Sequence, residues 1–360
     1  MGIQRRVASE LRLASRGNER VTVSIVLPIH DGAPYLRQAI DSMLAQSFSD
    51  FELIAIDDGS TDSSGDIVEA YSDQRIILLR QENRGLPATL NRGIALARGR
   101  YVARQDQDDV SQPDRLAKQV EFLDSHPDIA MVGTWAEIVA TSGRSDMRFH
   151  RHPHDPAILR FELLFDNPFV HSSVMMRMSA LDEVGGYTTD RTRQPPEDYE
   201  LWSRIARRHP VSNIPEVLHR YREVAGSMSR IGENGENPFA LHVVAISTES
   251  LAYALNQPSD SKELRDLAEL MHGVPSKTRL TTPFPRLLEI LWQLATDGGA
   301  NPPAIANELY FSARERLVAQ RPNYLRHRYP RPCGEIAGFI AAGLRALRGA
   351  AARLAGRLRT

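Results

Sequence analysis

Several features are scarce or absent in this 360-residue sequence, and each absence narrows the choice of protein class. The single cysteine, Cys333, excludes an internal disulfide bond and fits a reducing compartment. No segment approaches the ~20 uninterrupted apolar residues of a membrane-spanning helix, and residues 1–20 are polar and lack the apolar core of a secretion signal. The net charge of −1 gives no general reason to expect a nucleic acid as partner. We therefore predict a cytoplasmic protein that does not bind nucleic acid.

Two nucleotide-binding signatures are also missing. The first predicted strand is followed by Pro28-Ile-His-Asp-Gly32, which does not supply the G-x-G-x-x-G of nicotinamide-dependent oxidoreductases. The G-x-x-x-x-G-K-[ST] signature of P-loop NTPases is absent as well. These absences argue against both enzyme classes.

Short apolar, β-branched runs alternate with segments of helical spacing over the first part of the chain. Strands are predicted at 21–27, 51–56, 75–80 and 101–105, and helices at 35–46, 66–71, 86–97 and 115–125. This alternation predicts an α/β fold in which a mostly parallel, Rossmann-like sheet carries helices on both faces. Residues 129–139 form an apolar stretch; further strands are predicted at 171–177 and 216–221, and further helices at 159–165 and 197–208. We assign residues 21–232 to this domain.

Polar clusters follow three of these strands. Residues 28–31, 57–62 and 106–109 come directly after the first, second and fourth strands. Ligands of open parallel sheets bind beyond the carboxyl ends of the strands, so the three clusters predict one site. A bound cation would relieve the repulsion between Asp106 and Asp108, and hard oxygen ligands favour Mg²⁺ or Mn²⁺. The alternative is a solvated acidic turn before a helix.

A further acidic pair, Glu197 and Asp198, follows two prolines at the start of a predicted helix. The helix dipole favours ionised carboxylates at this position and is expected to hold their pKa values down. Taken alone, the pair is typical of ordinary acids in a first helical turn.

From residue 238 the sequence pattern becomes entirely helical. Helices are predicted at 239–255, 262–271, 285–295 and 303–319, separated by breaks that contain proline or glycine. They form a predicted helical region, 233–330.

The last segment, 331–360, combines an apolar stripe at helical spacing with arginines that lie mostly off the stripe. Such a basic amphipathic helix favours contact with an anionic membrane surface through residues 334–360, at the inner face of the cytoplasmic membrane. Docking of the stripe on the protein itself is the alternative.

A histidine-rich segment has the pattern H-x-H-x-H and contains His150, His152 and His154. Alternating histidines can bind a metal, but the prolines at 153 and 156 favour an ordinary surface loop.

Five motifs occur in an order and spacing typical of a known enzyme family. They are Val23-Ser-Ile-Val-Leu-Pro-Ile-His-Asp31, Gln46-Ser-Phe-Ser-Asp-Phe-Glu-Leu53, Asp57-Asp-Gly-Ser-Thr-Asp62, Asp106-Gln-Asp-Asp109 with Pro113-Asp-Arg-Leu116, and Glu197-Asp198. Together they resemble the family 2 inverting glycosyltransferases of the GT-A fold, over about residues 20–230. The lead-in, 1–20, and the C-terminal third lie outside the resemblance.

The resemblance implies a nucleotide-diphosphate sugar donor, a divalent metal and a hydroxyl acceptor. It implies that Pro28 and His30 line the nucleotide pocket and that Asp58 accepts a hydrogen bond from the base. An imide N–H is present in uracil and in thymine, so a UDP-sugar is expected, with a dTDP-sugar as the alternative. Asp106 would lie near the ribose and the donor sugar, and Asp108 would hold the Mg²⁺ or Mn²⁺ ion.

Asp198 matches the catalytic base of the family, with Glu197 beside it on the acceptor side. One carboxylate suffices as general base when the acceptor hydroxyl attacks the anomeric carbon from the face opposite the diphosphate. Such a single displacement inverts the configuration of that carbon.

Four further residues have two interpretations each. Arg84 and Arg92 could contact donor phosphates or be surface arginines. His171 could line the acceptor side or be a core histidine, which we favour. Trp202 could stack on a sugar or pack in the core.

One motif departs from the family pattern. Many relatives carry Tyr-Arg-x-His after the final strand, whereas this chain has Val224 in place of the histidine. A ligand to the metal or the diphosphate is therefore missing or supplied from elsewhere. The chain also lacks the Q-x-x-R-W signature of processive synthases, so transfer of one sugar per encounter is expected.

The resemblance thus implies a metal-assisted glycosyltransferase that acts on a saccharide or lipid-linked saccharide in cell-surface or exopolysaccharide assembly. The alternative is a catalytically silent GT-A module that binds a nucleotide sugar or serves as a scaffold at the membrane.

Overall fold

The computed structural model describes residues 21–224, 239–274 and 280–328 of the chain. The predicted lead-in, 1–20, and the predicted amphipathic helix, 331–360, lie outside these residues.

Residues 23–104 fold into the alternating pattern that the sequence predicts. The elements are β1 (Val23–Ile29), α2 (Ala33–Leu44), β2 (Phe51–Asp58), α3 (Ser64–Glu69), β3 (Ile76–Gln81), α4 (Leu86–Leu96) and β4 (Tyr101–Arg104). The four strands are parallel and lie in the order β3-β2-β1-β4. Every residue of β1 and β2 is buried, as expected of parallel strands that are covered on both faces. Strand β1 runs through Pro28 to Ile29, beyond its predicted end at residue 27.

The remainder of the sheet is mixed. Its elements are β5 (Val110–Ser111), α5 (Arg115–Ser125), β6 (Met131–Val139), β7 (Ser145–His150), α6 (Pro156–Glu162), the 3-10 helix η1 (His171–Ser173), β8 (Met175–Arg177), α7 (Met178–Val184), α8 (Glu197–Ala206) and β9 (Val211–Arg222). The order is β3-β2-β1-β4-β8-β6-β9-β5, with β7 paired to β6. Among the described residues, four of the eight strand pairings are antiparallel. The predicted α/β fold is confirmed, but a mostly parallel sheet is found only for β1–β4, because β8 enters beside β4 in the antiparallel direction.

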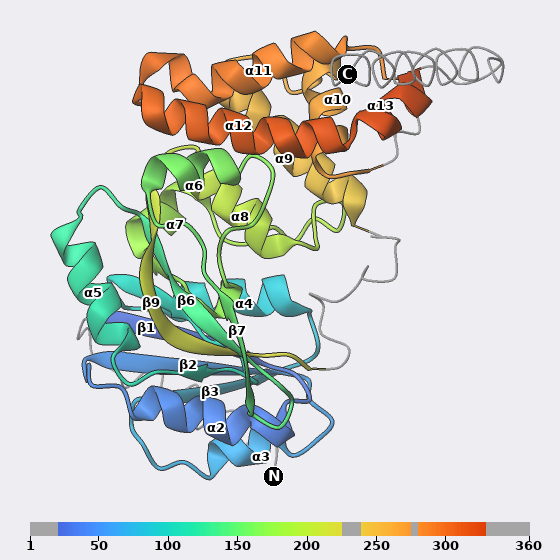
Figure 1. Cartoon of the computed structure of the whole chain (residues 1–360). Helices are drawn as coiled ribbons and strands as arrows, with labels where there is room; N and C mark the ends of the chain where they lie inside the picture. The colour runs from blue at the N-terminus through green and yellow to red at the C-terminus, as the bar shows by residue number, and fades with distance from the viewer. Residues whose placement is uncertain (1–20, 225–238, 275–279, 329–360) are drawn as a thin grey trace, which may run out of the picture.

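Helices cover both faces of the sheet. Successive residues of β1 point to opposite faces, so Ile25 and Leu27 pack with α2 and α5 whereas Val26 packs with α4, α7 and α8. Figure 1 shows α2 and α3 on one side of the sheet and α6, α7 and α8 on the other.

The C-terminal region is helical, as the sequence predicts. It contains α9 (Ala240–Ala254), α10 (Lys262–Met271), α11 (Phe284–Thr296), the 3-10 helix η3 (Asp297–Gly299), α12 (Pro303–Ala319) and α13 (Arg321–Arg328). Its apolar core includes Phe161, Leu164 and Phe165, so these helices pack on α6 and the segment that follows it (Figure 1). Within the described ranges, no helix combines the length and the apolar composition that crossing a bilayer would require.

Three elements differ from the sequence predictions. The predicted strand at 171–177 is wrong in its first half, where the chain forms η1 before it enters β8. Strand β7 is not predicted, because its two apolar residues, Met147 and Phe149, form too short a pattern, and His150 ends this strand instead of lying in a loop. Helix α6 begins at Pro156, earlier than predicted, because the Asp155 side chain accepts hydrogen bonds from two backbone N–H groups of the first turn.

Candidate active site

The predicted polar clusters meet at the carboxyl ends of β1, β2 and β4. The side-chain amide of Gln107 exchanges two hydrogen bonds, each of 2.9 Å, with the backbone of His30. The ring Nδ1 of His30 lies 3.1 Å from the carbonyl oxygen of Asp58. The exposed His30 therefore joins the segment after β2 to the segment after β4.

Two aspartates bind the loops after β1 and β2 to each other. Asp31 accepts a hydrogen bond from the Thr61 N–H at 2.7 Å, and this contact lowers the pKa of Asp31. Asp62 accepts from the Ala33 N–H at 3.0 Å and from the Ser64 N–H at 2.9 Å. Burial opposes ionisation of Asp62, but its donors outweigh burial and the pKa of Asp62 is lowered. Ionised carboxylates thus hold this part of the site together.

Asp58 fixes the turn between β3 and α4. Its carboxylate accepts hydrogen bonds from the N–H groups of Arg84 at 2.8 Å and Gly85 at 2.9 Å, and from Gln81 Nε2 at 2.6 Å. The residue is only 4% exposed. Because a carboxylate offers about four acceptor positions, one remains for a further donor.

A buried arginine, Arg104, lies beneath the acidic segment after β4. Its Nη2 donates to Asp106 Oδ1 at 2.6 Å, and the guanidinium is almost fully buried. Burial opposes the positive charge, but the Asp106 carboxylate and other neighbours outweigh burial and raise the pKa of Arg104. The sequence analysis missed Arg104, since one arginine at the end of an apolar strand forms no recognisable motif.

The last aspartate of the segment, Asp109, is a structural residue. It is 1% exposed and accepts hydrogen bonds from the Ser172 hydroxyl and from the Arg222 N–H at 2.8 Å, while His219 Nε2 lies 3.0 Å away. Burial opposes ionisation, but these contacts outweigh it and lower the pKa of Asp109. The Arg222 side chain also donates through Nε to the carbonyl oxygen of Asp108 at 2.7 Å. Strand β9 therefore holds the acidic segment in place.

Asp108 has the properties of a cation ligand. Burial raises the pKa of Asp108 to about 7, and the charges of Asp109 and Asp106 add to the shift. A divalent cation beside this carboxylate would offset both effects, and carboxylate oxygen is the ligand type that Mg²⁺ and Mn²⁺ prefer. Across the described residues, no three His, Cys, Asp or Glu side chains form a metal site. A cation held by Asp108 would have substrate phosphate oxygens and water available as further ligands.

Glu197 and Asp198 lie in the first turn of α8, as predicted. Asp198 accepts hydrogen bonds from Asn167 Nδ2 at 2.8 Å and from the Tyr199 N–H at 2.7 Å. The prediction that the helix start lowers their pKa values is wrong. Burial raises the pKa of Asp198, and burial together with the charge of Asp198 raises the pKa of Glu197 to about 7. Desolvation can shift a pKa by several units, which exceeds the effect of a helix dipole.

His171 connects the two acidic groups. Arg104 Nε donates to His171 Nε2 at 3.3 Å, and His171 Nδ1 lies 4.0 Å from Glu197 Oε1. Burial and then Arg104 hold the pKa of His171 well below its usual value, so the ring is neutral. A continuous set of contacts thus runs from Asp106 through Arg104 and His171 to Glu197. It brings Asp198 to the same side of the molecule as the acidic segment.

Trp202 and Pro28 present no open surface at the site. Trp202 is 0% exposed, and its ring packs edge-on against His171 and Tyr187 at centroid distances of 5.8 and 6.0 Å. Of the two interpretations of Trp202, the structure shows packing. Pro28 is buried within β1.

The two arginines that could contact phosphates differ. Arg92 Nη1 donates to Gln81 Oε1 at 2.6 Å, and Gln81 in turn donates to Asp58, so Arg92 is held close to that carboxylate. The Arg84 side chain is exposed and makes no hydrogen bond or ion pair with other described residues. Val224, where relatives carry histidine, is partly buried at the end of a described range.

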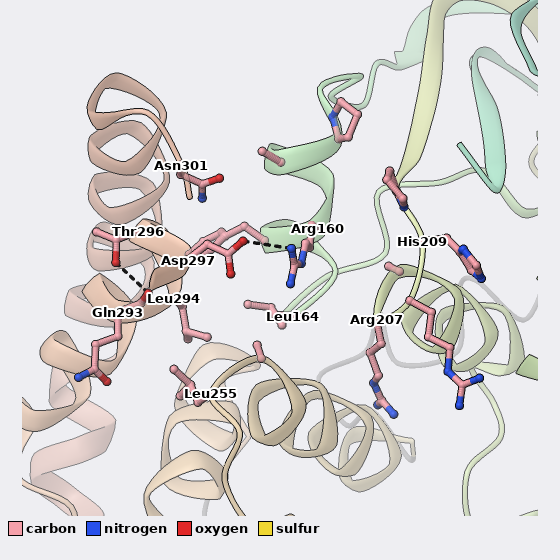
Figure 2. Close-up of a pocket in the computed structure, with 17 residues that line it drawn as sticks. Arg160, Leu164, Arg207, His209, Leu255, Gln293, Leu294, Thr296, Asp297 and Asn301 are labelled. Carbon is pink, nitrogen blue, oxygen red and sulfur yellow. Dashed lines mark hydrogen bonds and ion pairs between the residues drawn. The ribbon is translucent and has the colours of Figure 1, made fainter. Parts of the chain in front are cut away.

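A cavity of about 630 Å³ lies elsewhere, between α6, the end of α8, α9 and α11. Figure 2 shows Arg160 of α6 and Asp297 after α11 meeting across it, with a hydrogen bond of 3.0 Å. None of the site residues predicted from the sequence lines this cavity. It belongs to the contact between the sheet domain and the helical region.

Comparison with known proteins identifies a family. The family model "Glycosyl transferase family 2" matches residues 24–185. Putative glycosyltransferase EpsE of Bacillus subtilis is 34% identical over 218 residues, which cover 59% of this chain and 77% of that protein. The O-antigen biosynthesis glycosyltransferase WbnJ of Escherichia coli is 31% identical over 213 residues, covering 56% and 79%. The amylovoran biosynthesis glycosyltransferase AmsE of Erwinia amylovora is 31% identical over 196 residues, covering 53% and 71%.

A solved structure confirms the fold. The crystal structure of S. aureus TarS 1-349 in complex with UDP-GlcNAc superposes with a TM-score of 0.55 at 17% identity. The match covers 86% of this chain and 93% of that one, so it includes part of the C-terminal helical region.

Proposed function

This chain belongs to glycosyl transferase family 2, and on that premise we propose that it transfers one sugar from a nucleotide-diphosphate sugar to a hydroxyl group of a saccharide. The observation that carries the proposal is the set of contacts from Asp106 through Arg104 and His171 to Glu197. It brings Asp198, a carboxylate with a raised pKa, to the acidic segment that would hold the donor.

We assign the proton transfer to Asp198. As the acceptor oxygen forms a bond to the anomeric carbon, the bond from that carbon to the diphosphate breaks and the hydroxyl proton passes to Asp198. Attack from the face opposite the diphosphate inverts the anomeric configuration. The burial that raises the pKa of Asp198 makes it a stronger base than an exposed aspartate.

The donor occupies the ends of β1, β2 and β4 in this proposal. Asp58 has one acceptor position left for the imide N–H of uracil or thymine, and His30 and Asp106 lie at the same edge of the sheet. TarS, which shares the fold, binds UDP-GlcNAc, and this supports a UDP-sugar with a dTDP-sugar as the alternative. Asp108 would hold Mg²⁺ or Mn²⁺, whose charge offsets that of the leaving diphosphate when the ion is bound.

The names of relatives support the biological setting. WbnJ and AmsE are named for O-antigen and amylovoran biosynthesis. We propose that this chain likewise acts in the assembly of a cell-surface or extracellular polysaccharide, on a saccharide or lipid-linked saccharide acceptor.

The test is turnover of UDP- and dTDP-sugars by the full chain, with octyl glycosides as acceptors and Mn²⁺ or Mg²⁺ present. We expect nucleotide release that EDTA abolishes, and a fall of about 10²–10³-fold in the Asp108→Asn variant, the scale of a lost electrostatic contact to a developing charge. Asp124→Asn, a carboxylate that pairs with the surface residue Arg100, serves as the matched control and should keep its activity. Donor binding without turnover of any donor would favour the catalytically silent module, and unchanged turnover in Asp108→Asn would remove the metal assignment.

A further inference from the structure

Two histidines of the H-x-H-x-H segment form a stacked pair beside the candidate active site. The rings of His150 and His152 are nearly parallel, 12° apart, with centroids separated by 5.7 Å. Tyr221 of β9 meets the ring of His150 edge-on at 5.5 Å. The Trp135 indole N–H donates to the carbonyl oxygen of His152 at 2.8 Å and fixes the segment after β7. All three rings are partly exposed.

Strand register places the rings of His150 and Tyr221 on the face of the sheet that carries the site. His150 pairs with Ala136 and Tyr221 pairs with Ile138, and residues 136 and 138 of β6 share a face. His219, which contacts the Asp109 carboxylate, also pairs with Ala136 and so points to the same face.

The charged neighbours of the pair connect it to both acidic groups of the site. The charges of Glu223, Arg148 and Asp109 act on His150, and that of Asp166 acts on His152. Asp166 directly precedes Asn167, whose amide donates to Asp198. The electrostatic neighbours of the stacked rings thus include Asp109 of the acidic segment after β4 and Asp166, which adjoins the residue that bonds to the proposed base.

The chemistry of the pair selects a neutral ligand. Burial lowers the pKa of both rings, so they are uncharged at neutral pH. No ring nitrogen of His150 or His152 has a hydrogen-bond partner among the described residues, so each neutral ring offers one donor and one acceptor. Glu223 pairs with Arg148 and Asp166 pairs with Arg316, so the surroundings of the rings do not attract an ionic ligand.

We propose that His150, His152 and Tyr221 form the binding platform for a neutral sugar ring of the acceptor. The C–H face of the sugar packs on the imidazoles, and its hydroxyl groups bond to the free ring nitrogens. The inference rests on the proposed function, because it names the substrate class that faces Asp198.

Saturation-transfer NMR on the full chain with UDP and Mg²⁺ tests the platform without requiring a known donor. The probes are the methyl glycosides of glucose, galactose and N-acetylglucosamine, with methyl glucuronide as the charged counterpart. We expect saturation of ring C–H protons for at least one neutral glycoside and none for the glucuronide. A wild-type chain that saturates no neutral glycoside, or that prefers the glucuronide, would overturn the proposal.

The variants locate the contact. The double variant His150→Ala, His152→Ala should lose about three- to tenfold of the glycoside affinity, the scale of a ring-stacking contact. His154→Ala, an exposed histidine of the same segment, should bind as the wild type does. If the double variant melts early, His152→Gln removes one ring at nearly constant polarity and should still cost at least threefold. Unchanged glycoside affinity in either variant would contradict the proposed platform. Absence of donor turnover by the wild type would count against the proposed function alone.

Discussion

Asp109 and Asp198 are both aspartates at the candidate active site, yet their surroundings shift their pKa values in opposite directions. Asp109 lies on the donor side, which we define as the ends of β1, β2 and β4, and it has three hydrogen-bonding neighbours in η1 and β9. Asp198 lies on the base side, the start of α8, and accepts from one side chain and its neighbouring N–H.

The same division extends to other carboxylates. Asp31 and Asp62 of the donor side are also held by backbone N–H donors and have lowered pKa values. Glu197 of the base side has a pKa raised to about 7. The exception on the donor side is Asp108, also at about 7, which we propose as the cation ligand. Asp31, Asp62 and Asp109 are thus stabilised in the ionised form by their donors, whereas Asp108, the proposed cation ligand, and Asp198, the proposed base, have raised pKa values.

The largest expected effect is the loss of sugar transfer when the proposed base, Asp198, is replaced. Asp198→Asn keeps the shape of the side chain and its acceptor oxygen but cannot take a proton, so the rate of sugar transfer should fall by about 10²–10⁴-fold. Binding of UDP, measured by its effect on the melting temperature, should stay as in the wild type. Asp190→Asn, an exposed aspartate that bonds to Thr192 in the loop before α8, is the matched control. A rate within tenfold of the wild type in Asp198→Asn would remove the base assignment.

The positive charge of Arg104 acts on carboxylates of both the donor side and the base side. Replacing Arg104 should therefore reduce the stability of the fold around both sides. Burial raises the pKa values of Asp108, Glu197 and Asp198, and the charge of Arg104 offsets part of that effect. Arg104→Met leaves Asp106 without its ion-pair partner, and we expect a loss of about 2–4 kcal/mol in the free energy of unfolding, toward the low end of values for buried pairs because Asp106 is 29% exposed. The measurement is urea denaturation.

An exposed arginine nearby provides the contrast. Arg100 pairs with Asp124 at the surface, where its side chain is 57% exposed, so Arg100→Met should cost less than about 1 kcal/mol. Equal losses in Arg100→Met and Arg104→Met would show that burial of Arg104 has no special role.

The smallest expected change is a shift of the pH profile. Glu197→Gln removes a negative charge beside Asp198, so the pKa of Asp198 should fall and the acidic limb of kcat/KM should move to lower pH. Activity should rise with pH in both proteins, because the base acts in its ionised form. If the acidic limb of kcat/KM lies at the same pH in Glu197→Gln as in the wild type, then Glu197 and Asp198 titrate independently.

Stability gives a second readout for the same variant. The pKa of Glu197 is raised from 4.5 to about 7 on folding, so its stabilising contribution is present below pH 4.5 and is lost as the pH rises to about 7. Glu197→Gln should remove this part of the pH dependence of the melting temperature.

The residues that the sequence located share a recognisable position. Asp58 and Asp108 follow apolar strands, and Asp198 begins a helix after two prolines, so local pattern singled them out as candidates, whereas their proposed roles came from the family resemblance. Arg104, His219 and Arg222 carry no such pattern. Arg222 meets Asp109 across 113 residues of sequence, and the register that brings them together depends on how β9 pairs with β5 and β6. The stacked His150 and His152 were visible as a motif, but the predicted surface loop did not place His150 at the end of β7.

The sequence by itself determined the alternation of β1–β4 with α2–α4, the helical C-terminal region and the order of the acidic motifs, because hydrophobic period and strand-end residues are local properties. The tertiary structure decided which carboxylates are ionised, since burial and donors from distant segments set each pKa. It also decided that the second half of the sheet is mixed, because strand direction depends on where the chain re-enters the sheet. The chemistry of Asp198 depends on that packing, which no local pattern around α8 could reveal.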